Sequence, residues 1–138
     1  MGLKITLKPG ERMIIDGAVI TNGDAKSMFI VENRVPILRQ KDIIKEEAAN
    51  SPARRIYFVI QLMYIDQEQH AQYHPRYWEL VKEFVQAAPS STKLVNEISE
   101  QILKDQYYQA LKLTQKLIRY ETEILEHVQK STLSIPGR

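Results

Sequence analysis

Residues 12–24 read RMIIDGAVITNGD, and this stretch decides how the first third of the chain folds. It contains two dipeptides, Asp16-Gly17 and Asn22-Gly23, whose residues readily adopt the positive φ angles that a two-residue hairpin turn requires. Short runs rich in apolar and β-branched residues flank these turns, at residues 3–7, 12–15, 18–21, 27–31 and 35–38. We therefore expect five short strands arranged as a small antiparallel β-meander.

The apolar pattern inside each strand predicts which of its faces is buried. In Leu3 to Leu7 apolar and polar residues alternate, which is typical of a strand with one buried face. Met28 to Val31 is a continuous apolar run, which indicates a strand that is covered on both faces or lies at an interface. Pro36 has no backbone N–H, so residues 35–38 should form an edge strand or begin a loop. Because five short strands bury little surface, the β-module (residues 1–45) needs the helices or a second copy of the chain for support.

From about Asp42 onward the sequence is typical of helices. Ser51 can cap a helix that has Pro52 at its first position, and this helix should be the central buried element. Pro75 interrupts or begins a second helix, and Ser90 or Ser91 can cap a third. The first, second and last of the expected helices cover about residues 52–65, 75–88 and 106–129, and the third holds Leu94, Val95, Ile98, Ile102 and Leu103. The fold class is thus α+β, with the β-module followed by a C-terminal helical bundle in residues 46–130 that packs on it.

The last helix carries two adjacent apolar stripes. The first follows a three-four spacing and the second lies beside it; they comprise Ala110, Leu113, Leu117, Tyr120 and Ile124, and Tyr107, Leu111, Ile118, Leu125 and Val128. Two stripes indicate more than one packing neighbour. We therefore expect an interface with a second copy or another partner at Leu113, Leu117, Tyr120 and Ile124. Residues 131–138 should form a loose tail.

Composition limits the classes of protein to which the chain can belong. It has 138 residues, of which 43% are hydrophobic and 26% charged, as is ordinary for a globular domain. No apolar run approaches the roughly 20 residues that span a bilayer, and the N-terminus does not resemble a signal peptide. There is no cysteine, which excludes disulfides and thiolate chemistry. We expect a cytoplasmic protein that does not enter a membrane.

The polar residues give no support for catalysis or for a metal site. His70 and His74 have the i, i+4 spacing of two ligands on one helical face, but no third ligand is evident and Pro75 disturbs the helix there. Capping explains the clustered serines, and neither of the glycine-rich phosphate-binding motifs GxGxxG and GxxxxGK[ST] occurs. We expect no enzyme, no metal and no other cofactor.

Positive charge is concentrated in the first part of the chain. Residues 1–55 carry ten Lys and Arg against seven Asp and Glu, although the whole chain has a net charge of only +2. Arginine binds phosphate through two nitrogens and stacks on unpaired bases, which suits single-stranded RNA. The candidate RNA contacts are Arg34, Arg39, Lys41, Arg54 and Arg55, with Lys8 and Arg12 at the margin. The alternative is a solvated surface with ordinary ion pairs.

Several stretches, taken together and in order, resemble the FlbT family, the flagellar biosynthesis repressors of alphaproteobacteria. They are LKITLKPGE (3–11), DGAVITNGD (16–24), ILRQKDI (37–43), SPARRIYF (51–58), QLMYID (61–66), YYQALKL (107–113) and KLIRYE (116–121). The resemblance extends to about Val128. Two positions depart from it: Gln40, where Glu is common in the family, and Pro75, in a segment that is usually an uninterrupted helix.

The resemblance implies a post-transcriptional regulator with no catalytic residues. Proteins similar to FlbT associate with the 5′ untranslated leader of flagellin mRNA and lower its translation or stability, although some members activate. The implied partner is therefore the flagellin mRNA leader. We also expect the helices to form a homo-oligomer, which would double the charge offered to the RNA. A second hypothesis is a protein-interaction module that binds flagellin, a flagellin chaperone or a co-regulator through the last helix and affects mRNA indirectly.

Overall fold

The strands of the β-module begin and end close to where the apolar runs place them. The computed structural model describes residues 2–133 and contains β1 (Leu3–Leu7), β2 (Arg12–Ile15), β3 (Ala18–Thr21), β4 (Ser27–Val31) and β5 (Ile37–Arg39). The first four strands have the predicted bounds. β5 starts two residues later than predicted, because Pro36 has no N–H with which to join a ladder, although its carbonyl accepts a 2.8 Å hydrogen bond from the Asp16 N–H.

The Asp16-Gly17 dipeptide forms the predicted hairpin turn. Asp16 has a φ of 48° and Gly17 a φ of 84°, so both central residues lie in the left-handed region that a type I′ turn requires. The turn joins β2 to β3 in antiparallel register, with Arg12 opposite Thr21. This part of the sequence-based prediction is confirmed.

The Asn22-Gly23 dipeptide does not form a second hairpin, and the strands are not ordered as a simple meander. β4 pairs with β1, whereas β2 lies between β3 and β5 in a separate sheet. The chain therefore crosses from one sheet to the other after β3, and neither residue of the dipeptide has a positive φ. The Asn22 side chain instead fastens this crossing, since its Nδ2 donates to the carbonyls of Leu7, Lys8 and Ala25 at 2.8–3.2 Å and its Oδ1 accepts from the Ser27 hydroxyl.

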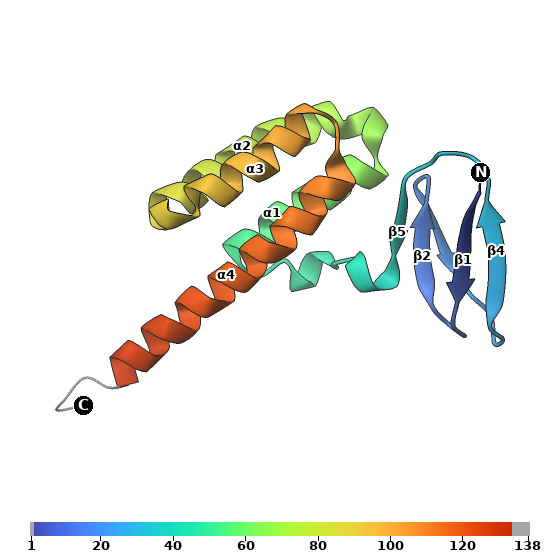
Figure 1. Cartoon of the computed structure of the whole chain (residues 1–138), viewed down its shortest axis with the longest axis horizontal. Helices are drawn as coiled ribbons and strands as arrows, with labels where there is room; N and C mark the ends of the chain where they lie inside the picture. Colours follow the sequence, from blue (N-terminus) through green and yellow to red (C-terminus); the bar gives the residue numbers. More distant parts are fainter. Residues whose placement is uncertain (1, 134–138) are drawn as a thin grey trace.

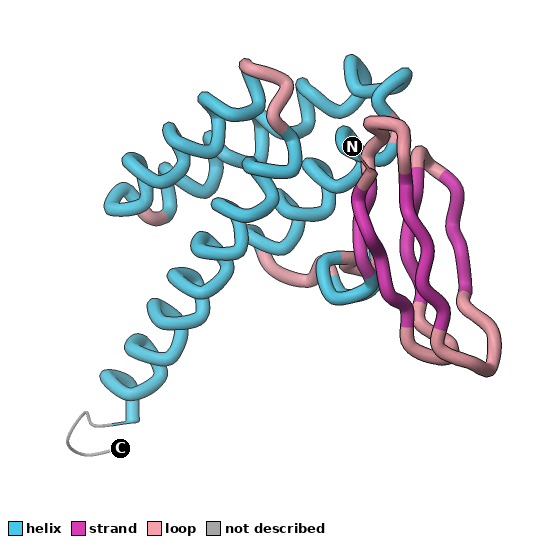
Figure 2. Tube along the Cα trace, turned by 45° about the vertical axis from the view of Figure 1, so that its right-hand side comes forward, coloured by secondary structure: helices cyan, strands magenta, loops and turns pink. Residues whose placement is uncertain are grey.

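The two sheets pack on each other, and the larger one also packs on the helices (Figure 2). Ile5 and Leu7 of β1 and Met13 of β2 are buried between the sheets. Ile14 and Leu38, on the opposite face of the β3-β2-β5 sheet, belong to the core of the helical region. These two side chains thus join the β-module to the helical core.

The helical region consists of α1 (Pro52–Ile65), α2 (His70–Ala87), α3 (Thr92–Leu103) and α4 (Tyr107–Leu133) (Figure 1). α1 has the predicted bounds, and the Ser51 hydroxyl accepts a hydrogen bond from the Arg54 N–H as its cap. α2 begins five residues before Pro75, which it includes at the cost of one backbone hydrogen bond. α4 continues four residues past the predicted end, and residues 134–138 of the predicted tail lie outside the described part of the chain.

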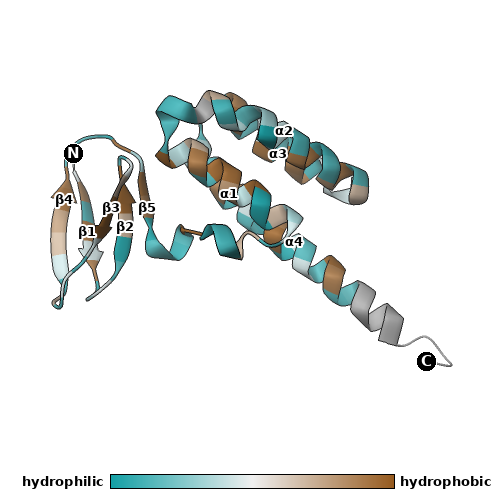
Figure 3. Ribbon diagram, turned by 180° about the vertical axis from the view of Figure 1, so that it is seen from behind, coloured by the Kyte–Doolittle hydropathy of each residue, from teal (hydrophilic) through white to brown (hydrophobic). Residues whose placement is uncertain are grey.

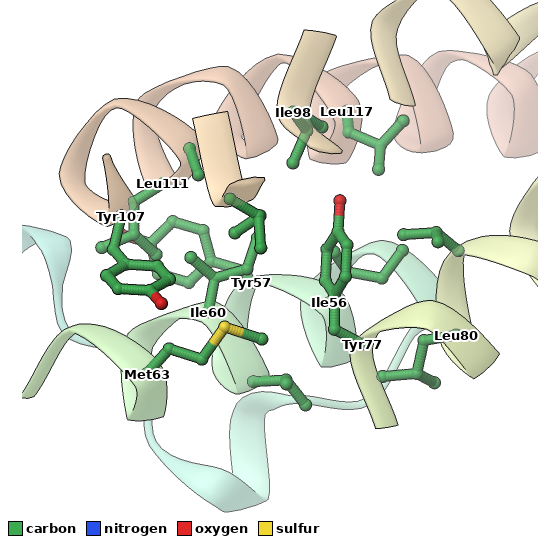
Figure 4. Close-up of a cluster of buried hydrophobic side chains, with 14 of the residues drawn as sticks. Ile56, Tyr57, Ile60, Met63, Tyr77, Leu80, Ile98, Tyr107, Leu111 and Leu117 are labelled. Atoms are coloured by element: carbon green, nitrogen blue, oxygen red, sulfur yellow. The ribbon is translucent and has the colours of Figure 1, made fainter. Parts of the chain in front are cut away.

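α1 is the central buried helix, as its sequence predicts. Ile56, Ile60 and Met63 are fully buried, and α1 packs against both α2 and α4 (Figure 4). Burial raises the pKa of Tyr57 and of Tyr77 to about 12. Both hydroxyls keep hydrogen-bond partners, since Tyr57 donates to the Asp42 carbonyl at 2.5 Å and Tyr77 lies 2.8 Å from the Ser99 hydroxyl. Within residues 2–133, none of the helices combines the length and the apolar character needed to cross a bilayer.

Candidate nucleic-acid interface

Two pairs of side-chain hydrogen bonds hold the β-module against the end of α1. The Tyr64 hydroxyl accepts from the Ile37 N–H at 3.0 Å and donates to the Ile37 carbonyl at 3.1 Å. The Gln61 amide makes the same pair of bonds with the N–H and carbonyl of Ile44, at 2.8 and 2.9 Å. These side chains bind backbone groups that are not paired within a strand or helix. The connection between the β-module and α1 therefore has a defined geometry.

A cleft of about 360 Å³ lies at this junction, between β1 and β5 on one side and α1 and α4 on the other. We call it the junction cleft; its walls comprise Leu3, Lys4, Ile5, Val35, Ile37, Arg39, Lys41, Asp42, Tyr64 and Tyr108. Three of these side chains are cationic and two are aromatic. The cleft thus combines phosphate-binding charge with rings on which a base can stack.

The aromatic wall is formed by Tyr64 and Tyr108, whose ring centroids are 5.9 Å apart. Tyr108 is 37% exposed, so part of its ring is available to a ligand. The Lys112 ammonium lies 5.1 Å from the centroid of the Tyr108 ring and 3.6 Å from the carboxylate of Asp42. Its pKa is raised, first by the hydrogen bond with Tyr108 and then by the charge of Asp42, so Lys112 is cationic at neutral pH. Lys112 also offsets the negative charge of Asp42 within the cleft.

Arg39 has a structural task as well as a place in the cleft. Its Nη2 donates to the Thr6 carbonyl at 2.6 Å and lies 3.4 Å from the Glu11 carboxylate, so it ties β5 to β1. The hydrogen bond from the Lys8 backbone N–H lowers the pKa of the Glu11 carboxyl, and the hydrogen bond and charge of Arg39 lower it further. Part of the hydrogen-bonding capacity of Arg39 is therefore already used, and Lys4 and Lys41 are the more exposed cations of the cleft.

The structure brings only some of the predicted RNA contacts together. Arg39 and Lys41 line the cleft, and Arg34 is exposed in the loop next to Val35, a wall residue. Lys8 and Arg12 are exposed: Lys8 directly follows β1, and Arg12 is the first residue of β2.

Arg54 and Arg55 lie elsewhere. They occupy the first turn of α1, whereas Tyr64 at its last turn meets the β-module. Ten residues of helix separate these positions by about 15 Å. The Arg54 guanidinium donates to the Ser51 hydroxyl, and Arg55 lines a different pocket. The structure therefore does not bring these two candidate contacts to the junction cleft, because the connection from β5 runs back along α1 before the helix begins (Figure 1).

Sequence reasoning missed Lys4, Tyr64, Tyr108 and Lys112. Lys4 was recognisable as an outward residue of an alternating strand. Tyr108 follows Tyr107, which belongs to an apolar stripe, so Tyr108 had to lie off that stripe. The approach of α4 to β1 and β5, however, depends on tertiary packing that no local pattern encodes.

The predicted interface stripe on α4 mostly serves the chain's own core. Leu117 is fully buried, and Leu113 and Tyr120 pack against the same cluster. Ile124 instead lines an apolar pocket of about 400 Å³ between the start of α1, the end of α2 and α4, together with Leu125, which is 54% exposed. We call it the α4 pocket.

The α4 pocket contains a buried carboxylate. Glu121 is 6% exposed, and its Oε2 accepts a 2.8 Å hydrogen bond from the Ala53 N–H at the start of α1. Its Oε1 is buried and has no hydrogen-bond partner within the described residues. The pocket can therefore accept an apolar group that brings a hydrogen-bond donor.

His74 lines neither the junction cleft nor the α4 pocket. The His74 ring approaches the Tyr107 hydroxyl at 3.3 Å and packs edge-on against its ring. In the part of the chain that the structure describes, no three His, Asp or Glu side chains form a cluster able to hold a metal ion.

Comparison with known proteins gives a consistent result over nearly the whole chain. A family model described as flagellar protein FlbT matches residues 3–125. The chain is 43% identical over 125 residues to the probable flagellum biosynthesis repressor protein FlbT 1 of Bradyrhizobium diazoefficiens, covering 90% of this chain and 85% of the relative. It is 37% identical over 130 residues to the flagellum biosynthesis repressor protein FlbT of Caulobacter vibrioides, covering 93% and 92% of the two chains. No solved structure matches.

Proposed function

The chain belongs to the FlbT family of flagellum biosynthesis repressors, and from this premise we propose that it represses after transcription, by binding the 5′ untranslated leader of flagellin mRNA in the junction cleft. Membership in a repressor family identifies a regulatory protein and not an enzyme. The observation that carries the RNA proposal is the convergence of Lys4, Arg39 and Lys41 with the Tyr108 ring in one cleft.

The chemistry of the cleft suits an unpaired stretch of RNA. Lys4 and Lys41 would contact phosphates, which gives affinity that falls with salt. The exposed part of Tyr108, with Lys112 behind it, would stack on one base. Because stacking needs an unpaired base, binding would hold a segment of the leader single-stranded and occupied, and this would lower its translation or stability.

Removal of the two exposed cleft cations is expected to weaken leader binding without unfolding the protein. In Lys4→Ala/Lys41→Ala, two lost phosphate contacts should weaken binding roughly tenfold or more at moderate salt and reduce the slope of log K against log salt by about 1.4. Tyr108→Ala should cost about 1–3 kcal/mol of binding at every salt concentration. The measurement is a titration of labelled leader RNA at several salt concentrations.

The matched control is Lys82→Ala/Lys93→Ala, which removes the same charge from exposed positions on α2 and α3. It should lower affinity far less than the cleft variant. Equal weakening by both variants would show that binding follows net charge alone, and wild-type affinity in the cleft variant would remove the junction cleft from the proposal.

A second candidate function rests on the α4 pocket. Its apolar walls and the unpartnered Glu121 oxygen favour a protein partner that inserts an apolar side chain next to an N–H or ammonium donor. Flagellin, a flagellin chaperone or a co-regulator would then be the ligand, and the effect on mRNA would be indirect. Purified protein that does not bind the leader at low salt, but captures a purified flagellar protein and loses it on Ile124→Asp, would establish this function in place of RNA binding.

A further inference from the structure

β4 presents an unprotected sheet edge. Within residues 2–133 its ladder partner is β1, and its other edge carries backbone N–H and carbonyl groups that no strand pairs. Native edge strands are usually blunted by proline, by lysine within the strand or by a covering element. The five residues of β4, SMFIV, contain none of these, and β4 is the strand farthest from the helices (Figure 1).

The outward face of the same strand is apolar. Met28 is 63% exposed and Ile30 is 61% exposed, while Phe29 and Val31 turn toward the core of the β-module. Figure 3 shows the apolar colouring along this outermost strand. The exposed outward face accounts for the continuous apolar run in the sequence of β4. The inward side chains of the run are covered by the chain itself, and the outward side chains are not.

The charged residues on either side of β4 are complementary to those of a second, antiparallel copy of the strand. Lys26 and Glu32 flank the strand and are exposed, and they share the outward face with Met28 and Ile30 if the alternation of β4 continues one residue past each end. Suppose that a second β4 pairs antiparallel about a two-fold axis at Phe29. Phe29 then lies opposite Phe29 of the other copy, and each residue before it lies opposite the residue equally far after it. Lys26 then lies opposite Glu32 of the other copy, and Met28 opposite its Ile30.

We propose that β4 is a homodimerisation edge, at which two copies of the chain pair antiparallel about Phe29 to form a continuous β1-β4-β4-β1 sheet. The pairing satisfies the unpaired backbone groups, joins the exposed apolar side chains and places opposite charges face to face twice in each dimer. A slip of one residue would turn each of these side chains away from its partner, so the charges and the apolar pair specify the same register. The occupant is a second copy, and the inference does not rest on RNA binding.

The charge pairing gives a reversible test. In Lys26→Glu, two opposite-charge pairs become like-charge pairs, which should weaken the dimer on the order of tenfold. The exchange Lys26→Glu/Glu32→Lys restores opposite charges across the axis and should restore the dimer. Sedimentation equilibrium over micromolar concentrations measures both dissociation constants. A wild-type protein that remains monomeric throughout, or a dimer that Lys26→Glu leaves unchanged, would overturn the proposal.

Crosslinking tests the register directly, because the chain has no cysteine of its own. Cysteines introduced as Met28→Cys in one copy and Ile30→Cys in another would face each other at about 4.5–5.5 Å between Cβ atoms. Mild oxidation of the mixed proteins should therefore crosslink them faster than either protein alone. Val19→Cys, on the exposed edge strand β3, is the matched control and should crosslink slowly. Equal rates in all samples would show that β4 does not pair with β4.

Discussion

Leu117→Ala is expected to lower the free energy of unfolding by about 2–5 kcal/mol, as large-to-small changes in a packed core do. Leu117 is fully buried on α4 and packs within the cluster that joins α1, α3 and α4 (Figure 4). The loss combines the transfer energy of the removed carbons with the cavity that they leave. Chemical denaturation with a far-ultraviolet circular dichroism readout measures it.

Leu103→Ala is the matched control for this change. It removes the same atoms from a helix, but Leu103 is 70% exposed, so the expected effect stays within about 0.5 kcal/mol. The comparison also separates two interpretations of the α4 stripe. If Leu117 contacted a partner chain in place of its own core, its replacement would weaken association and leave the stability of the monomer near that of Leu103→Ala.

Asn22→Ala is expected to destabilise the β-module by about 2–4 kcal/mol, because it removes a group of hydrogen bonds that each contribute about 0.5–1.5 kcal/mol. The side chain bonds three carbonyls and the Ser27 hydroxyl where the chain crosses between the sheets. Hydrogen exchange should show the largest loss of protection in β1 and β4. Helical amides should lose much less.

Two further variants isolate the cause. Asn22→Asp keeps the acceptor for Ser27 but replaces three donated bonds with a carboxylate facing carbonyl oxygens, so it should be at least as destabilising as Asn22→Ala. Asn33→Ala, at an exposed position in the next loop, should have little effect. If Asn22→Asp retained wild-type stability, the donated bonds could not be what holds the crossing.

Local patterns predicted the elements well, and the reasons are physical. The period-two alternation of β1, the Asp16-Gly17 turn and the Ser51-Pro52 helix start depend on residues within a few positions of one another, and all three are present. The second helix was predicted to begin or be interrupted at Pro75, but α2 begins at His70 and includes this proline. The effect of a proline depends on its position, and near the start of α2 it removes one backbone hydrogen bond.

Features that depend on distant parts of the chain were not predictable in this way. Asn22-Gly23 has the sequence of a hairpin turn, but its backbone conformation follows from β4 pairing with β1 instead of β3. Arg54 and Arg55 lie in the first turn of α1, so their distance from Arg39 depends on the direction in which this helix runs. The junction cleft likewise exists only because Tyr108 of α4 lies near β1, the strand that contains Lys4.

The pairing of β1 with β4 determines when this chain can fold as it leaves the ribosome. The β2–β3 hairpin can close as soon as Thr21 has emerged, whereas Leu3 must wait for Val31, which comes 28 positions later. Even then, Ile14 and Leu38 remain uncovered until the helices whose core they join have been made. The nascent chain therefore exposes these apolar strand residues until the later helices have been translated and the shared core can close.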